Sequence, residues 1–179
     1  MTIITALYSG GKVYFGYNDG MTIGDSPFPG KSCPWVRLGR WAIGVSGSTN
    51  IFNILGHHAH DFDDSQSSAA NMVFKIRSLL IQYNLGGRDG EGFEDQYGIW
   101  CILANVDGEI WDLDNKMAYT EVQEGTLWAR GSGTEYALGA DFVSSQQGFS
   151  PEDRIKWATD AAIANDLYCC GQSKIQILT

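Results

Sequence analysis

Residues 1–18 read MTIITALYSGGKVYFGYN, and this opening stretch predicts a β-hairpin. Residues 3–7 and 12–18 are rich in β-branched and aromatic side chains and are separated by a glycine turn. Thr2 stands directly before the first strand. If Met1 is removed, the α-amine of Thr2 lies beside its own hydroxyl and can take the proton as the hydroxyl attacks a carbonyl. Thr2 fits an ordinary β-branched strand residue equally well, so the rest of the chain has to decide between the two interpretations.

Strand and turn patterns continue to residue 46. A turn at Asp19-Gly20 leads into a short strand over residues 21–24. Residues 25–34 hold three of the four prolines and predict a loop. A second hairpin is predicted over residues 36–38 and 41–46. The first part of the chain is therefore expected to contain strands only.

Helices and strands then follow in blocks. The predicted helices run over about residues 48–60, 65–83, 131–145 and 151–166, with Ser48, Asp64 or Ser65, and Ser150-Pro151 as start signals. The predicted strands cover residues 97–104, 109–113, 118–122, 126–130 and 174–178, and residues 86–95 form a glycine-rich loop. This order differs from the alternating βαβα pattern of a parallel sheet. It predicts an α+β domain spanning residues 1–179, with two antiparallel sheets packed face to face and helices outside each.

The composition narrows the class of protein. The chain has 179 residues, of which 44% are hydrophobic and 18% charged, and its formal net charge is −9. This acidic balance argues against nucleic acid as a partner. We expect no membrane span, no signal peptide and a cytoplasmic location, because neither a long apolar run nor a basic leader is present. The four cysteines show no CxxC spacing, so a disulfide framework and cysteine-bound zinc are not expected.

Four segments along the chain carry a family resemblance. They read TIGD at residues 22–25, IGVSGS at 43–48, GSGTEYALGA at 131–140 and DLYCCG at 166–171. Together with Thr2 and the element order, they resemble the proteasome β-type subunits, including HslV and their shorter bacterial relatives. The resemblance implies the N-terminal nucleophile (Ntn) hydrolase fold, a four-layer αββα sandwich. It also implies assembly of identical subunits into a ring or spiral.

The resemblance assigns expected roles to four residues. Thr2 is the nucleophile, and the backbone N–H of Gly47 belongs to the oxyanion hole that stabilises developing negative charge. Ser132 hydrogen-bonds the Thr2 amine, and Asp166 orients that serine and amine through charge-assisted bonds. A site of this kind hydrolyses peptide bonds and needs no cofactor.

Two positions depart from the family pattern. The resemblance places Asn18 where the family has an aspartate, and Pro34 where it has the lysine that lowers the proton affinity of the hydroxyl. The two losses are consistent with each other, since either charge alone would be buried without a partner. Asp19 is expected on the opposite face of the strand and is a poor substitute. Lys31, in the predicted loop, remains an open substitute.

A second constellation gathers all three histidines with aspartates. His57 and Asp61, or His60 and Asp64, fall one helical turn apart, which would suit a metal ion. The alternative, which we prefer, is a solvated helix end followed by an acidic turn, with no metal.

Two functions remain open at this stage. One is a ring-forming subunit with a degenerate site that serves assembly, with incorporation into a viral or other particle left open. The other is a threonine-type endopeptidase that acts through Thr2 on peptide substrates, with an unfoldase as a further partner.

Overall fold

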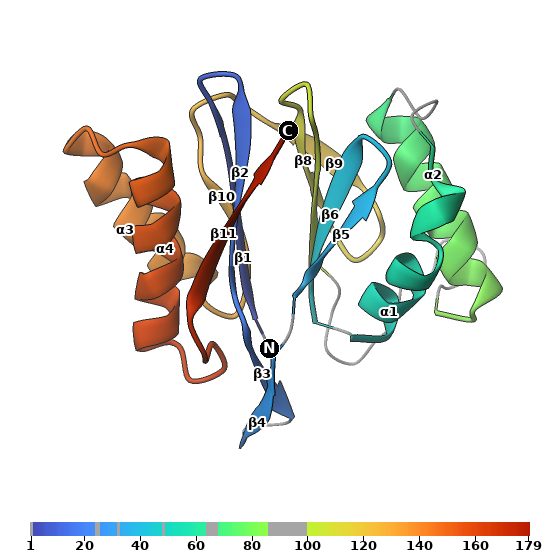
Figure 1. Cartoon of the computed structure of the whole chain (residues 1–179), viewed down its shortest axis with the longest axis horizontal. Coiled ribbons are helices and arrows are strands. Elements are labelled where there is room, and N and C mark those ends of the chain that lie inside the picture. The colour runs from blue at the N-terminus through green and yellow to red at the C-terminus, as the bar shows by residue number, and fades with distance from the viewer. Residues whose placement is uncertain (1, 24–25, 32, 48, 64–67, 86–99) are drawn as a thin grey trace.

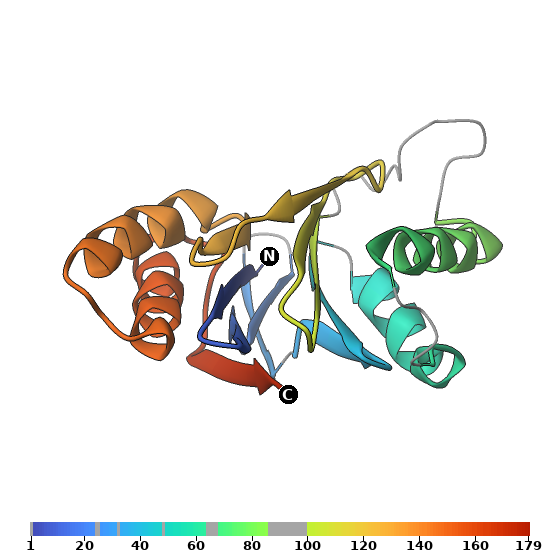
Figure 2. The ribbon, with the colours of Figure 1, turned by 90° about the horizontal axis from the view of Figure 1, so that it is seen from above.

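The protein is a sandwich of four layers, two central antiparallel sheets between two pairs of helices (Figure 1). The computed structural model describes residues 2–23, 26–31, 33–47, 49–63, 68–85 and 100–179. The predicted αββα arrangement is confirmed. Seen from above in Figure 2, each helix pair covers the outer face of one sheet, and the two sheets face each other.

The first sheet contains both the first and the last strand of the described chain. Its order is β10-β1-β2-β11, and all neighbours are antiparallel. Its strands are β1 (Ile3–Ser9), β2 (Lys12–Asn18), β10 (Trp128–Gly131) and β11 (Ser173–Leu178). The hairpin predicted from residues 1–18 is confirmed, with the turn at Gly10-Gly11, where both glycines have positive φ.

The second sheet has five strands in the order β5-β6-β7-β8-β9. They are β5 (Trp35–Leu38), β6 (Trp41–Ser46), β7 (Trp100–Asn105), β8 (Ile110–Leu113) and β9 (Tyr119–Val122). Arg130 of β10 joins this sheet to the first one, because its guanidinium binds both carboxylate oxygens of Asp112 on β8. The guanidinium and the carboxylate form two hydrogen bonds side by side, which fix the relative orientation of the two side chains as well as their separation.

A small hairpin projects from one end of the sandwich (Figure 1). It consists of β3 (Gly20–Ile23) and β4 (Ser26–Lys31), which pair with each other in an antiparallel sheet of their own. The prediction of a loop over residues 25–34 is wrong for this part. Proline removes a backbone donor but is tolerated on an edge strand, and the two prolines of β4 lie on such a strand. Gly24 and Asp25 of the TIGD segment lie outside the described residues.

The helices lie in two pairs, one on each outer face of the sandwich. They are α1 (Thr49–His57), α2 (Ala69–Gln82), α3 (Thr134–Gln146) and α4 (Pro151–Asn165), with a short 3₁₀ helix η1 (Ala59–Asp61) after α1. The N-cap of α4 is Ser150, as predicted, and its hydroxyl accepts a hydrogen bond from the N–H of Asp153 at 3.1 Å. The start of α2 differs from the prediction, because Ser68 caps it by accepting a bond from the N–H of Asn71. The predicted caps Ser48, Asp64 and Ser65, and the loop over residues 86–95, lie outside the described residues.

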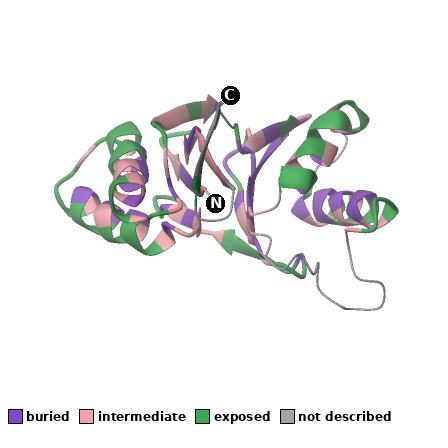
Figure 3. Cartoon of the chain, turned by 90° about the horizontal axis from the view of Figure 1, so that it is seen from below, coloured by how far each residue is buried: buried purple, intermediate pink, exposed green. Residues whose placement is uncertain are grey.

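Three apolar clusters hold the four layers together. One packs α1 and α2 on the five-stranded sheet, with Trp41, Met72 and Ile76 fully buried in it. A second packs α3 and α4 on the four-stranded sheet. The third fills the space between the two sheets, and Phe15 lies in it. Figure 3 shows buried residues on the inner faces of the helices and exposed residues on their outer faces, which is the pattern of amphipathic helices on a sheet.

No described helix is both long and apolar enough to cross a membrane.

Candidate functional site around Thr2

Thr2 lies at the start of β1, with its side chain against the end of β2. Its hydroxyl donates a hydrogen bond to Oδ1 of Asn18, which is the last residue of β2. The antiparallel register Ile4–Tyr17 brings these two strand ends together. Thr2 is half-buried, whereas Asn18 is completely buried. The residue that the resemblance places at the family's aspartate position thus contacts Thr2 directly.

The amide group of Asn18 uses its whole hydrogen-bonding capacity. Oδ1 accepts from the Thr2 hydroxyl and, at 2.8 Å, from the N–H of Ile3. Nδ2 donates to the carbonyl oxygens of Cys170, at 2.8 Å, and Gly20, at 3.2 Å. An amide has two acceptor sites and two donors, so no further partner can be added in the same plane. The backbone partners also fix which end of the amide is oxygen, because an N–H can only donate and a carbonyl can only accept.

The carbonyl of Thr2 is held from two sides. Ser46, the last residue of β6, donates its hydroxyl to this carbonyl at 3.2 Å. Gly131 packs against the same oxygen, and a Cβ added there would lie 1.9 Å from it. Gly131 also has a φ of +125°, so the position requires glycine for two independent reasons. Gly47, the expected oxyanion residue, directly follows Ser46 in the chain and has a φ of +110°.

Ser132 and Asp166 form the second half of the site. The Ser132 hydroxyl donates to Oδ1 of Asp166 at 3.1 Å, which brings the start of α3 to the end of α4. The same carboxylate oxygen accepts the N–H groups of Tyr168, at 2.7 Å, and Cys169, at 3.2 Å. These bonds close the turn after α4 and fix the carboxylate in place. The Ser132–Asp166 pairing expected from the resemblance is therefore formed. Ser132 follows Gly131, which packs against the carbonyl of Thr2, and the expected bond from Ser132 to the Thr2 amine stays a prediction.

Cys169 lies against Ser132, with 3.6 Å between the sulfur and the hydroxyl oxygen. Burial raises the pKa of its thiol to about 11. The thiol is therefore protonated at neutral pH and contributes no charge to the site. Sequence reasoning did not assign a role to Cys169 or to Ser46, although both belong to segments that carry the resemblance.

Pro34 is buried directly before β5. Its carbonyl accepts the N–H of Val45 at 2.8 Å, one residue before Ser46 on β6. The position expected to hold a lysine is thus occupied by a side chain that can neither carry charge nor donate a hydrogen bond. The side chain of Lys31, the open substitute, lies outside the described part of the molecule.

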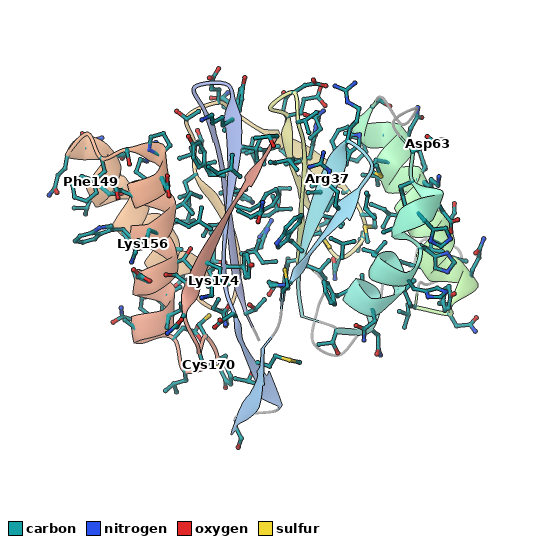
Figure 4. All side chains as sticks on the ribbon, in the orientation of Figure 1. Arg37, Asp63, Phe149, Lys156, Cys170 and Lys174 are labelled. Carbon is teal, nitrogen blue, oxygen red and sulfur yellow. The ribbon has the colours of Figure 1, made fainter. Side chains whose placement is uncertain are left out.

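Asp19 is engaged on the other side of the strand, as expected. Its Oδ1 accepts the N–H of Gln172 at 2.8 Å, and its Oδ2 lies 3.7 Å from Nζ of Lys174. Figure 4 shows Lys174 on β11 and Cys170 in the turn that precedes it. The Asp19 carboxylate therefore binds groups in β11 and directly before it, whereas the side chain of its neighbour Asn18 points to Thr2.

These hydrogen bonds determine how readily the Thr2 hydroxyl can act as a nucleophile. It donates its hydrogen to an amide oxygen, which is a poor proton acceptor compared with a carboxylate or an amine. Activation would therefore depend on the α-amine of Thr2, which becomes free only when Met1 is removed. Asn18 and Ser46, the described side chains that hydrogen-bond Thr2, are neutral, so they give little electrostatic help to an alkoxide at this point.

The histidine cluster forms a separate network on the α1–α2 layer. His58 bonds Oδ2 of Asp61 at 2.6 Å through Nδ1 and the hydroxyl of Tyr83 at 2.7 Å through Nε2. The His58 hydrogen bond lowers the pKa of Asp61. Among the described residues, no group of three or more histidine, cysteine, aspartate or glutamate side chains could hold a metal ion. Asp64, one of the suggested ligands, lies outside them.

Solved structures with the same fold are found, although no protein-family model and no curated protein sequence matches the chain. BPH from Thiobacillus denitrificans superimposes with a TM-score of 0.81 at 18% identity, covering 100% of this chain and 99% of that one. The same protein in complex with epoxomicin gives 0.80 at 17% identity, with 100% of each chain covered. Eukaryotic HslV from Trypanosoma brucei gives 0.74 at 15% identity, with 98% of each covered. The chain therefore has the proteasome β-type fold along its whole length, as the resemblance implied.

Proposed function

We propose that this chain is a cytoplasmic, ring-forming subunit of the proteasome β-type whose threonine site is silent and whose role is assembly. The single observation that carries the proposal is the amide of Asn18. It stands at the position of the family's aspartate, contacts Thr2 directly and is fully engaged by neutral partners. A site selected for a carboxylate would not direct two carbonyl oxygens at the same group.

Pro34 supports the same interpretation independently. A lysine at this position without a carboxylate at position 18 would be an unpaired buried charge, which costs several kcal/mol. The buried proline avoids that cost and binds β6 through its carbonyl. Loss of both charged groups together leaves a neutral site that the fold tolerates.

The outer face of the α3–α4 layer supports self-association. Phe142 and Trp157 are 68% and 56% exposed, and Tyr136 and Val143 are exposed on the same two helices. Trp157 also contacts Phe149 edge to face, with 5.4 Å between ring centroids, and Phe149 lies at the outer edge of this layer in Figure 4. Apolar side chains gathered on one face of a water-soluble protein are typical of a subunit interface.

The second candidate function is a threonine-type peptidase. The observation in its favour is that the Ser132–Asp166 hydrogen bond is formed and that Ser46, the residue before Gly47, and Gly131, the residue before Ser132, both contact the carbonyl of Thr2. A protein of the same fold has been solved in complex with epoxomicin. In this case Thr2, freed by removal of Met1, acts with its own amine as base and without the help of a lysine.

Intact-mass analysis after exposure to a peptide epoxyketone separates the two functions. An epoxyketone reacts with both the hydroxyl and the free amine of an N-terminal threonine. The silent subunit is expected to show no adduct. A stoichiometric adduct that disappears in Thr2→Ala would overturn this proposal and establish the peptidase. The same measurement reports whether Met1 is present.

A further inference from the structure

β9 is an edge strand with unused backbone hydrogen-bonding groups. Among the described residues it pairs with β8 alone. The N–H of Asp114 bonds the carbonyl of Ala118 at 3.0 Å, which sets the phase of this antiparallel pair. Because hydrogen-bonded and non-hydrogen-bonded pairs alternate, Thr120 and Val122 direct their backbone groups to β8. The N–H and C=O groups of Tyr119 and Glu121 therefore point away from the sheet.

A groove runs beside this edge. Its volume is about 470 Å³, and its lining comes from β8, β9, the following turn and β10: Asp112, Thr120, Glu121, Val122, Gln123, Thr126 and Trp128. Thr120 and Val122 alternate with Tyr119 and Glu121 along β9, so they contribute the side chains on the groove side. The groove thus lies where an edge of each sheet is open, since β10 is the end strand of the first sheet.

Trp128 contributes a donor that lacks an acceptor. Its indole N–H is buried and has no hydrogen-bond partner among the described residues. The ring itself is fixed, with the guanidinium of Arg130 lying 5.4 Å from its centroid. A buried donor without a partner is uncommon in a folded protein and calls for an explanation. Because the indole N–H groups of Trp35 and Trp111 are in the same state, this donor does not mark a ligand by itself, and the Trp128 indole serves as a spectroscopic reporter of the groove wall.

The charged residues beside the groove favour one kind of binding partner over another. Glu121 is exposed on the edge strand, and Glu124 is exposed in the turn that follows. Arg130, which lies over the Trp128 ring, is neutralised by Asp112. Arg154, which donates to the carbonyl of Gly125 in the following turn, is paired with Asp141. A second copy of the chain paired antiparallel through β9 would bring its own Glu121 and Glu124 to the same edge, and like charges on paired strands repel. Lys116 lies in the β8–β9 turn, away from both glutamates in sequence.

We propose that the β9 edge and the adjoining groove bind an extended peptide segment with alternating apolar and cationic side chains. The segment adds a strand to the five-stranded sheet through the N–H and C=O groups of Tyr119 and Glu121. Its apolar side chains enter the groove beside Val122 and Trp128. Its cationic side chains lie on the opposite face, against Glu121.

The test uses the full chain and a designed probe, the acetylated and amidated hexapeptide with the repeat Lys-Val. Binding is followed by two-dimensional NMR of the ¹⁵N-labelled protein, where the amides of Tyr119 and Glu121 and the indole of Trp128 report on the site. We expect these signals to shift in a saturable manner. We expect a peptide with glutamate in place of lysine, and one N-methylated on its pairing edge, to bind roughly tenfold more weakly or not at all.

Two variants of one residue separate charge from backbone pairing. Glu121→Gln removes only the charge and is expected to weaken binding about threefold. Glu121→Pro removes in addition the outward N–H, which takes no part in pairing with β8, and is expected to weaken binding at least tenfold. Glu135→Gln, an exposed acidic residue on α3, serves as the control and should bind as the parent does.

Three results would overturn the proposal. They are an N-methylated peptide that binds as tightly as the unmodified one, a glutamate peptide that binds as tightly as the lysine peptide, and saturable shifts that spare β9 and the Trp128 indole. Absence of any change in the NMR signals at millimolar peptide would also overturn the proposal. The peptide comparisons need no mutation, so they decide the question even if Glu121→Pro does not fold.

Discussion

The side-chain amide of Asn18 is held in one orientation by its hydrogen bonds. Its Nδ2 group faces two carbonyl oxygens, at 2.8 Å and 3.2 Å, in a completely buried position. Replacing this group by a carboxylate oxygen would bring three acceptors together without a proton between them. The surrounding backbone therefore favours a neutral side chain with donors at position 18.

The first prediction follows for Asn18→Asp. We expect the free energy of unfolding to fall by about 2–4 kcal/mol at pH 8, as for a buried charge without a partner. The measurement is urea unfolding followed by tryptophan fluorescence. Asn50→Asp, at an exposed position in the first turn of α1, is the matched control and should change stability by no more than about 0.5 kcal/mol.

The pH dependence of the same variant has a definite sign. The new carboxyl is buried against acceptors, so its pKa in the folded state lies above the value of about 4 in the unfolded chain. The penalty is therefore absent below pH 4, grows as the pH rises toward the folded-state pKa and is constant above it. A penalty that is equal at pH 4 and pH 8 would contradict this account.

A second prediction concerns the pair of lost charges. Pro34→Lys alone should destabilise the protein, because the ammonium has no carboxylate beside it. In Asn18→Asp/Pro34→Lys the two charges can neutralise each other, so the loss in unfolding free energy should be smaller than the sum of the single losses by about 1–3 kcal/mol. Strict additivity in the double-mutant cycle would show that positions 18 and 34 do not communicate.

A third prediction concerns the cysteines. Burial raises the pKa of Cys169 to about 11 and that of Cys101 to about 12, whereas Cys33 is exposed. Since the thiolate is the reactive form, iodoacetamide at pH 8 should modify Cys33 far faster than either buried cysteine. Peptide mapping of the native protein after short exposure gives the order. Equal rates at Cys33 and Cys169 would mean that the turn after α4 opens readily.

At this scale the sequence could nominate candidate site residues and the Ser132–Asp166 pair, which is hydrogen-bonded, but not the backbone contacts around them. Thr2, Asn18, Ser132 and Asp166 follow from the order of four short segments along the chain. The direction of the Asn18 amide depends on the carbonyls of Gly20 and Cys170, and one of these lies 152 positions further along the chain. Backbone groups carry no signature in a sequence, so contacts of this kind become visible only in the folded structure.

At the scale of single elements, periodicity and turn signals located the strands and helices well where the signal was strong. The β1–β2 hairpin and the Ser150-Pro151 start of α4 are examples. β3 agrees with the short strand predicted over residues 21–24, but its partner β4 was missed because prolines argue against a strand. The exception for edge strands depends on which side of a strand remains unpaired. The later start of α2, at Ser68, reflects competition among several capping residues in a polar segment.

The fourth prediction tests how α4 approaches the first sheet. A Cβ on Gly16 would lie 2.4 Å from Oγ1 of Thr5 and 2.6 Å from side-chain atoms of Ile155 and Thr159. These groups are fully buried between β1, β2 and α4, so they have little room to move. Gly16→Ala should therefore lower the free energy of unfolding by about 1–3 kcal/mol.

Gly139 provides the matched control for this substitution. It lies in the interior of α3, is exposed, and a Cβ there would meet nothing within 4 Å. Gly139→Ala should stabilise the protein by about 0.5–1 kcal/mol, because alanine favours the helix. The two variants should shift the urea midpoint in opposite directions. A shift in the same direction would mean that α4 does not pack as closely on β2 as the structure has it.

At the scale of the whole molecule, two sheets and two helix layers leave two outer faces. Among the described residues of the helix layers, the exposed aromatic side chains are Phe74 and Tyr83 on the α1–α2 layer and Tyr136, Phe142 and Trp157 on the α3–α4 layer, where Val143 is exposed as well. Composition alone could predict a globular protein, and element order could predict the layers, but neither could say which outer face is apolar. That depends on the rotation of each helix about its own axis, which the packing of the core determines.

The last prediction concerns assembly. If the α3–α4 face is a subunit interface, Phe142→Lys/Trp157→Lys places two charges on it and removes two aromatic contacts. Loss of such residues from an interface costs about 2 kcal/mol or more each, so the dissociation constant should rise by a factor of about 1,000. Light scattering coupled to size-exclusion chromatography should then show a shift from an oligomer to smaller species. Phe74→Lys, at a 63% exposed position on α2, tests the opposite layer as a control. If Phe74→Lys dissociates the oligomer and the double variant does not, the interface lies on the α1–α2 face. If the parent protein is itself a monomer, the proposed assembly role has no basis.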